Sequence, residues 1–295
     1  MARPLRIEFA GAVYHLSSKA EAGAVVFHDD ADRRALLAVI AQAMERFDAQ
    51  VLAYCLEPDS YELLLFTRQA NLSRLMRHIN GVYTQACNRR HGSVGHLFQG
   101  RFKAVLVDRE TLLLDACRYV ELGGVRRGLA ASPAQWPWSS YAAHVGQTEA
   151  PEWLDVQGLH AFVMGRPLQG AADRRKAAQR YEKLVAEASG MDLWRHLRQQ
   201  IYLGDAAFVE RLKGQLKGQL KDASPARKVA KGAAAALKAR PWRDWLHEAG
   251  SREEALYRAH TEGGLSMTGL AKELGLSVSR VSRLIAGHER QRHQH

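Results

Sequence analysis

Two side chains in the stretch from Pro58 to Leu65 could take part in metal chemistry. Ser60 and Glu62 lie two residues apart in a segment that reads as a β-strand, so both would lie on one face of that strand. A glutamate carboxylate is a good oxygen ligand for Mg²⁺ or Mn²⁺, whereas a serine hydroxyl is a poor ligand. Glu62 is therefore only a weak candidate for a metal ligand, because one carboxylate with waters would hold an ion weakly.

A second kind of chemistry is the binding of phosphate by basic side chains. Arg101 and Lys103 are two residues apart in another predicted strand, and we expect them to project from one face of it. Such groups hold a nucleic-acid backbone without reading its sequence. The alternative for each residue is an ordinary solvated basic surface. Four further arginines join this group of candidate DNA-binding residues: Arg89, Arg90, Arg126 and Arg127.

A third group lies near the C-terminus, where the spacing is typical of a helix-turn-helix. A helix over 253–261 is followed by one that begins at Ser266 or Met267, a Gly275-Leu276 turn, and a third helix over 278–285 that Ser277 can cap. Apolar residues at positions 278, 281, 284 and 285 would face the core of this domain. The opposite face carries hydroxyl and guanidinium donors suited to phosphates and guanine edges, namely Ser279, Arg280, Ser282 and Arg283. The alternative is a helical hairpin that contacts proteins.

The first half of the chain alternates strand and helix patterns in the order β-α-β-β-α-β-α. This order predicts an α+β, ferredoxin-like domain with an antiparallel sheet and helices on one face. Asp29 or Asp30 can cap the first helix and Asn71 the second. The strands are expected over 13–16, 50–55, 61–67 and 102–107, and the helices from 30 to about 47, from 72 to at least 83, and over 112–122.

The rest of the chain is predicted to be helical. The segment Trp136-Pro137-Trp138-Ser139-Ser140-Tyr141 is read as a loop wedged onto the core, and residues 166–187 as a charged helix. Residues 213–238 are rich in Lys, Gln, Gly and Ala, which is typical of a solvated helix or a mobile linker. We therefore expect a domain over 1–145, a basic helical linker region over 146–245, and the helix-turn-helix domain over 246–295.

The charge of the chain favours a polyanion as its partner. The 295 residues carry a formal net charge of +11. Residues 1–150 hold 17 Lys and Arg against 15 Asp and Glu, whereas residues 151–295 hold 25 against 16. Such an excess favours nucleic acid. The three cysteines show no paired spacing, which favours a reducing cytoplasm. The sequence contains no run of 18 apolar residues, so we expect no membrane partner.

Several strings in the first 145 residues resemble one family. The most specific is Gly95-His96-Leu97-Phe98-Gln99-Gly100-Arg101-Phe102-Lys103. The others are residues 1–9, Gly11-Ala12-Val13-Tyr14-His15, Asn80-Gly81-Val82-Tyr83-Thr84-Gln85, Asn88-Arg89-Arg90-His91-Gly92, Cys117-Arg118-Tyr119-Val120 and the segment 136–141. Together they resemble the REP-associated tyrosine transposases, which are relatives of the single-strand transposases in the HUH endonuclease superfamily. The resemblance covers about half of the chain, and a C-terminal helix-turn-helix also fits this family.

The resemblance implies a mechanism. Members of this family cut single-stranded DNA beside hairpins, and a tyrosine hydroxyl attacks the phosphodiester to form a covalent phosphotyrosine link. A divalent ion, held by two histidines on one strand and a third polar group, polarises the scissile phosphate. Tyr119 matches the nucleophile of the family, whereas Tyr83 matches a tyrosine that is not the nucleophile.

The expected metal ligands are replaced in this chain. Ser60 and Glu62 stand where the family has its two histidines, and Gly123 stands where the family commonly has an asparagine that is a plausible third ligand. We therefore expect nicking to be lost or severely impaired. One alternative is a rebuilt oxygen-rich site, using Glu62 with Asp59 or Glu121, that would still bind Mg²⁺ or Mn²⁺. Substitute histidine ligands can also be considered, although each is more simply a motif residue or an exposed side chain: His15, His78, His91 and His96.

Three functions follow from this interpretation. The first is a transposase-like enzyme that cuts and rejoins single-stranded DNA through Tyr119. The second is a non-catalytic DNA-binding regulator on the same scaffold, and the third is a protein-interaction module, which the charge disfavours. The expected partner is DNA, as a single-stranded hairpin, as duplex or as both, in the cytoplasm at the nucleoid. The resemblance implies a monomer or a homodimer.

Overall fold

A computed structural model describes most of the chain. The described residues are 7–21, 24–188, 190–214, 242–261, 265, 267–277, 280–281, 283–285 and 288. They fall into two compact units, residues 1–210 and residues 211–295, and each unit is described by itself. Within the described residues, no helix has both the length and the apolar character needed to cross a bilayer.

Unit 1 is a mixed α+β structure built around one six-stranded sheet with the order β2-β3-β1-β4-β6-β5. The pairs β1–β3, β1–β4 and β2–β3 are antiparallel, as expected. The pair β4–β6 is parallel, so the expectation of a purely antiparallel sheet is wrong at this edge. The strands are β1 (Ala12–Lys19), β2 (Ala49–Glu57), β3 (Ser60–Thr67), β4 (Lys103–Val107), β5 (Leu197–Arg198) and β6 (Tyr202–Leu203).

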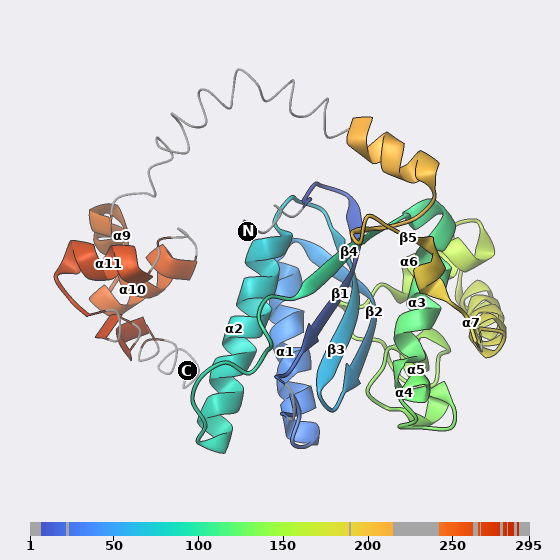
Figure 1. The fold of residues 1–295 in the computed structure, drawn as a ribbon, viewed down its shortest axis with the longest axis horizontal. Helices are drawn as coiled ribbons and strands as arrows, with labels where there is room; N and C mark the ends of the chain where they lie inside the picture. The colour runs from blue at the N-terminus through green and yellow to red at the C-terminus, as the bar shows by residue number, and fades with distance from the viewer. Residues whose placement is uncertain are drawn as a thin grey trace. The chain divides into compact units, whose positions relative to one another are not determined.

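Helices cover both faces of the sheet (Figure 1). Helices α1 (Asp30–Phe47) and α2 (Leu72–His91) lie on one face, and α3 (Arg109–Glu121) lies on the other. The prediction of helices on one face is therefore wrong for α3. Alternate strand residues point to opposite faces, and Val13, Leu64 and Val105 pack into a cluster with the buried side of α3. The strands are apolar on both faces because each face is covered.

Capping residues fix where the helices begin. The Asp29 side chain accepts a hydrogen bond from the backbone N–H of Asp32 at the start of α1. Asn71 occupies the N-cap position of α2, but its side chain donates to the carbonyl oxygen of Phe47 at 2.8 Å instead of capping the helix. Asp108 caps α3, so this helix begins at Arg109, three residues earlier than predicted.

The chain beyond α3 stays packed on unit 1 up to residue 210. The segment 136–141 runs along β2, where the N–H of Leu56 donates to the carbonyl of Trp138. The domain therefore extends well beyond residue 145, because β6 pairs with β4 and completes the sheet. Most of the predicted basic linker, residues 215–241, lies outside the described residues. The remaining elements of unit 1 are α4 (Gly123–Arg126), η1 (Pro133–Gln135), α5 (Tyr141–His144), α6 (Val156–Met164), α7 (Ala171–Ala186) and η2 (Leu193–His196).

Unit 2 contains three described helices, α9 (Trp242–Glu248), α10 (Arg252–Thr261) and α11 (Met267–Leu274). Gly275 has φ +64°, a conformation that favours glycine, and it ends α11. The hydroxyl of Ser277 accepts from the N–H of Arg280, as an N-cap residue does. Val281 and Ile285 are buried in the core of this unit, whereas Arg280 and Arg283 are exposed. Ser279 and Ser282 lie outside the described residues.

Candidate active site

The Ser60 and Glu62 side chains lie on the face of the sheet that α3 covers. The register pairs Glu62 with Ser17 of β1 and with Cys55 of β2. Tyr61, which lies between Ser60 and Glu62 in the sequence, points to the opposite face of the sheet, where its ring packs edge-on against Phe98. The period of the strand therefore places Ser60 and Glu62 on the same side of the sheet as Tyr119, which α3 carries.

Two cationic or potentially cationic side chains approach the Glu62 carboxylate. The guanidinium of Arg126 donates to Glu62 Oε2 at 3.0 Å, and His15 Nε2 lies 3.8 Å from the same oxygen. Burial raises the pKa of Glu62, but His15 and Arg126 outweigh burial and hold the pKa below its usual value. Glu62 is therefore an ionised group whose charge is compensated by an arginine of the chain itself.

Tyr119 is held from three sides. Its hydroxyl accepts a hydrogen bond of 2.7 Å from Trp194 Nε1, and the two rings meet edge to face with centroids 5.4 Å apart. The guanidinium of Arg126 lies over the tyrosine ring, 3.6 Å from its centroid, and also donates to the Tyr119 carbonyl oxygen. The ring of His15 lies 6.0 Å from that of Tyr119. Arg126 therefore joins Tyr119 to Glu62.

The side chain of Ser60 is already engaged. Its hydroxyl donates to Glu57 Oε2 at 2.8 Å and lies 3.1 Å from Asp59 Oδ1. Arg127 forms ion pairs with both carboxylates: its guanidinium nitrogens lie 2.7 Å from Asp59 Oδ1 and 3.4 Å from Glu57 Oε2. Burial raises the pKa of Glu57, and the nearby charge of Glu62 adds to this effect. Two arginines, Arg126 and Arg127, thus form ion pairs with the three carboxylates around Ser60.

Gly123 leaves no room for a ligand side chain. A Cβ atom at this position would lie 2.8 Å from Cys55 Sγ and 2.9 Å from Glu57 Oε1, closer than such contacts occur. The residues at the three expected ligand positions do not fit a divalent ion. Ser60 is hydrogen-bonded, Glu62 is ion-paired with Arg126, and Gly123 offers no donor and no space. A further cation here would also meet the charge of Arg126.

The alternative ligands are placed as follows. Glu121 is fully buried and points away from Glu62, because its carboxylate accepts from Ser140 Oγ, Tyr181 Oη and His144 Nδ1. Asp59 is bound by Arg127 and by Lys19. His15 is buried beside Glu62, and among the described residues its Nε2 has no hydrogen-bond partner.

His78, His91 and His96 do not reach this site. His78 packs against Phe47 on the other face of the sheet, and His91 bonds to Asp32 at the start of α1. His96 is exposed and lines a groove along α2. His15 is therefore the one member of the four that the fold brings to Glu62.

The predicted DNA-binding residues of unit 1 divide into two groups. Arg90, Arg126 and Arg127 form ion pairs with carboxylates of the chain. Arg89, Arg101 and Lys103 are exposed. Arg101 precedes β4, so the predicted shared strand face with Lys103 is wrong. It lines a groove of about 490 Å³ along α2 with other polar side chains: Ser73, Arg77, Asn80, Thr84, Gln85 and His96.

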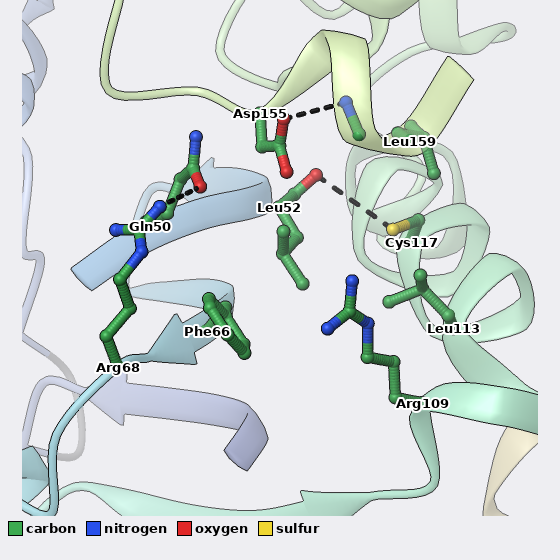
Figure 2. Close-up of a pocket in the computed structure, with 10 residues that line it drawn as sticks. Gln50, Leu52, Phe66, Arg68, Arg109, Leu113, Cys117, Asp155 and Leu159 are labelled. Atoms are coloured by element: carbon green, nitrogen blue, oxygen red, sulfur yellow. Dashed lines mark hydrogen bonds between the residues drawn. The ribbon is translucent and has the colours of Figure 1, made fainter. Parts of the chain in front are cut away.

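A second basic hollow lies on the α3 face, at the ends of β3 and β4 (Figure 2). Its volume is about 200 Å³, and Phe66, Arg68 and Arg109 are among the residues that line it. Figure 2 shows the Arg68 guanidinium beside Gln50, to which it donates a hydrogen bond of 3.0 Å. The guanidinium carbons of Arg68 and Arg109 lie 5.7 Å and 5.2 Å from the Phe66 ring centroid. The sequence analysis missed these two arginines. The signal was present, because Arg68 is the first residue and Arg109 the second residue after a predicted strand. Strands β3 and β4 both run antiparallel to β1, so both end at the same end of the sheet.

Residues 9–122 match the model of a family described as "Transposase IS200 like". This part of the chain is similar to the IS200-like transposases. A similar solved structure is that of a REP-associated tyrosine transposase bound to a REP hairpin, with 16% sequence identity over 51% of this chain and 89% of that chain, and a TM-score of 0.45. No curated protein matches the chain.

Proposed function

We propose that this chain is a DNA-binding protein, built on an IS200-like transposase domain of the REP-associated kind, in which metal-dependent nicking is lost or severely impaired. The observation that carries the proposal is the position of Arg126, whose guanidinium bonds to Glu62 and covers the Tyr119 ring. A permanent cation of the chain thus lies beside the candidate nucleophile and is ion-paired with Glu62, the one carboxylate at the three expected ligand positions. The same observation favours the second candidate, a non-catalytic DNA-binding regulator.

The DNA-binding part of the proposal is supported by charge and exposure. The net charge of +11 favours a polyanion. In unit 1, the exposed Arg77 and Arg101 line a groove that also contains hydroxyl, amide and imidazole side chains, which suits a sugar-phosphate backbone. Such a protein would act in the cytoplasm, at the nucleoid.

Two finer features of the fold belong to the same proposal. The strand order β2-β3-β1-β4, with antiparallel pairs throughout, supports the ferredoxin-like class for this core. In unit 2, the turn at Gly275 after α11 and the capping bond at Ser277 support the helix-turn-helix. Arg280 and Arg283 would then be the residues that meet duplex DNA.

Covalent capture tests whether Tyr119 still cuts DNA. The full chain is incubated with a labelled single-stranded oligonucleotide that carries a hairpin, with Mg²⁺ or Mn²⁺, and is resolved on a denaturing gel. We expect DNA binding in a native gel but no covalent adduct, because no bound ion polarises the phosphate. An adduct that disappears in Tyr119→Phe would overturn the loss of nicking. An adduct lost in Tyr83→Phe instead would move the nucleophile to α2.

The double variant Arg280→Ala/Arg283→Ala tests the role of unit 2. We expect its affinity for duplex DNA to fall at least about tenfold, and the dependence of log affinity on log salt to become shallower by about 1 to 2, because two cationic contacts are removed. Arg252→Ala removes a similar exposed charge at the start of α10 and is the matched control. Unchanged affinity and salt dependence in the double variant would remove the helix-turn-helix from the DNA-binding proposal.

A further inference from the structure

A group of metal-ligating side chains lies away from the candidate active site. The group consists of His28, Cys87 and His91, each of which offers one ligand atom, and these atoms all lie within 4.8 Å of one another. The first residue precedes α1, and the other two belong to the last turns of α2. Helix α2 covers the face of the sheet opposite to α3, so this group is separated from Tyr119 by the sheet (Figure 1).

The fold brings these three residues together for identifiable reasons. Cys87 and His91 are four residues apart on α2 and therefore lie on one face of that helix. The end of α2 meets the start of α1, where Arg90 binds both Asp29 and Asp32. His28 is the residue before the N-cap Asp29, so the ion pair between Arg90 and Asp29 also places His28 beside the end of α2. The rings of His28 and His91 have centroids 4.2 Å apart.

A buried carboxylate supports the group. Asp32 is 1% exposed, and both of its oxygens lie 3.0 Å from His91 Nε2. The same carboxylate accepts a hydrogen bond of 2.8 Å from the backbone N–H of His28. A carboxylate that fixes the ring of a ligating histidine is the usual support of a metal site. Cys87 is buried as a free thiol, so its sulfur is not committed to a disulfide.

We propose that His28, Cys87 and His91 bind one Zn²⁺-like transition-metal ion, which clamps the start of α1 to the end of α2. Two imidazoles and a thiolate are the donors that Zn²⁺ prefers, and they do not suit Mg²⁺. The fourth ligand is water, because both Asp32 oxygens are already bonded to His91, to Arg90 and to the His28 N–H. Cys87 loses its thiol proton to solvent when the ion binds, and no oxidation or reduction takes place. The ion is structural, because the sheet keeps it from Tyr119.

Titration with Co²⁺ tests the site directly. The full chain is freed of metal with a chelator, and Co²⁺ is added while the visible and near-ultraviolet absorption is recorded. We expect one equivalent to give the bands of a tetrahedral site together with a sulfur-to-metal charge-transfer band, and Zn²⁺ to displace the Co²⁺. We also expect Zn²⁺ to raise the melting temperature of the chain, because an ion that binds only the folded state stabilises it.

Single variants assign the ligands. Cys87→Ser should abolish the charge-transfer band, and His28→Gln or His91→Gln should weaken Co²⁺ binding at least about tenfold. His96→Gln, an exposed histidine beyond the end of α2, is the matched control and should bind as the wild type does. His28 is exposed, so its replacement tests the site even if Cys87→Ser does not fold. A wild-type chain without the charge-transfer band, or equal affinity in His28→Gln and wild type, would overturn the proposal. Neither outcome depends on DNA binding or nicking.

Discussion

Glu121→Ala is expected to lower the free energy of unfolding of unit 1 by about 3 to 5 kcal/mol, because it removes the shared acceptor of a buried polar network. The Glu121 carboxylate accepts from Ser140 Oγ at 2.5 Å and from Tyr181 Oη at 2.8 Å, and it also bonds to His144 Nδ1. Ser140 precedes α5, His144 lies in α5 and Tyr181 lies in α7. The Glu121 carboxylate therefore connects α5 and α7 to α3. The variant would remove the acceptor of the buried Tyr181 hydroxyl and His144 Nδ1, and would leave Ser140 Oγ only the Tyr54 carbonyl oxygen at 3.5 Å.

Urea unfolding followed by circular dichroism measures this effect. Glu149→Ala removes an exposed glutamate and should change stability by no more than about 0.5 kcal/mol, so it serves as the control. Glu121→Gln keeps the side-chain volume and one acceptor oxygen, and its loss should be smaller than that of Glu121→Ala. A loss below about 1 kcal/mol in Glu121→Ala would show that the network does not hold these helices in place.

The second large effect concerns Arg126. In a chain with Ser60→His and Glu62→His, the further change Arg126→Ala should raise the affinity for Mn²⁺ at least about tenfold. The guanidinium lies 3.0 Å from Glu62 Oε2, so an ion held at this position would experience a full positive charge a few ångströms away. Removing that charge stabilises the bound ion, although Gly123 still supplies no third ligand.

Mn²⁺ affinity is measured by isothermal titration or by the loss of the free-ion resonance signal. Arg74→Ala in the same histidine background is the matched control, since Arg74 is exposed on α2, across the sheet from the site. Equal Mn²⁺ affinity with and without Arg126 would contradict the view that this arginine takes the place of the ion. Adduct formation by the variant without Arg126 would show in addition that Tyr119 remains a competent nucleophile.

Local sequence signals predicted the first four strands and the placement of the helices between them. Alternating apolar residues and capping side chains act over a few residues, so they are visible in the sequence. Strands β5 and β6 have two residues each, which is too short to show an alternation of apolar and polar residues. They form because β6 pairs with β4 and β5 pairs with β6. The extension of unit 1 to residue 210 depends on the same pairing and could not be predicted.

The candidate site was predictable only in part. The period of a strand places Ser60 and Glu62 on one face, and this follows from the sequence alone. The approach of His15 to Glu62 depends on the register between β1 and β3. The contacts of Tyr119 with Arg126 and with Trp194, which is 75 residues away in sequence, depend on how later segments pack on α3. Interactions of this kind are set by tertiary structure and leave no local pattern.

The packing of Gly123 bears on how this site can change over evolutionary time. An asparagine at position 123 would have to displace Cys55 and Glu57 before its amide could face Glu62, because its Cβ would lie within 3 Å of both side chains. Gly124 is enclosed in the same way by the Trp136 ring, 2.5 Å from the position of a Cβ. A single substitution therefore cannot rebuild the third ligand without a cost in stability. A ligand side chain at position 123 would require compensating changes in β2 first.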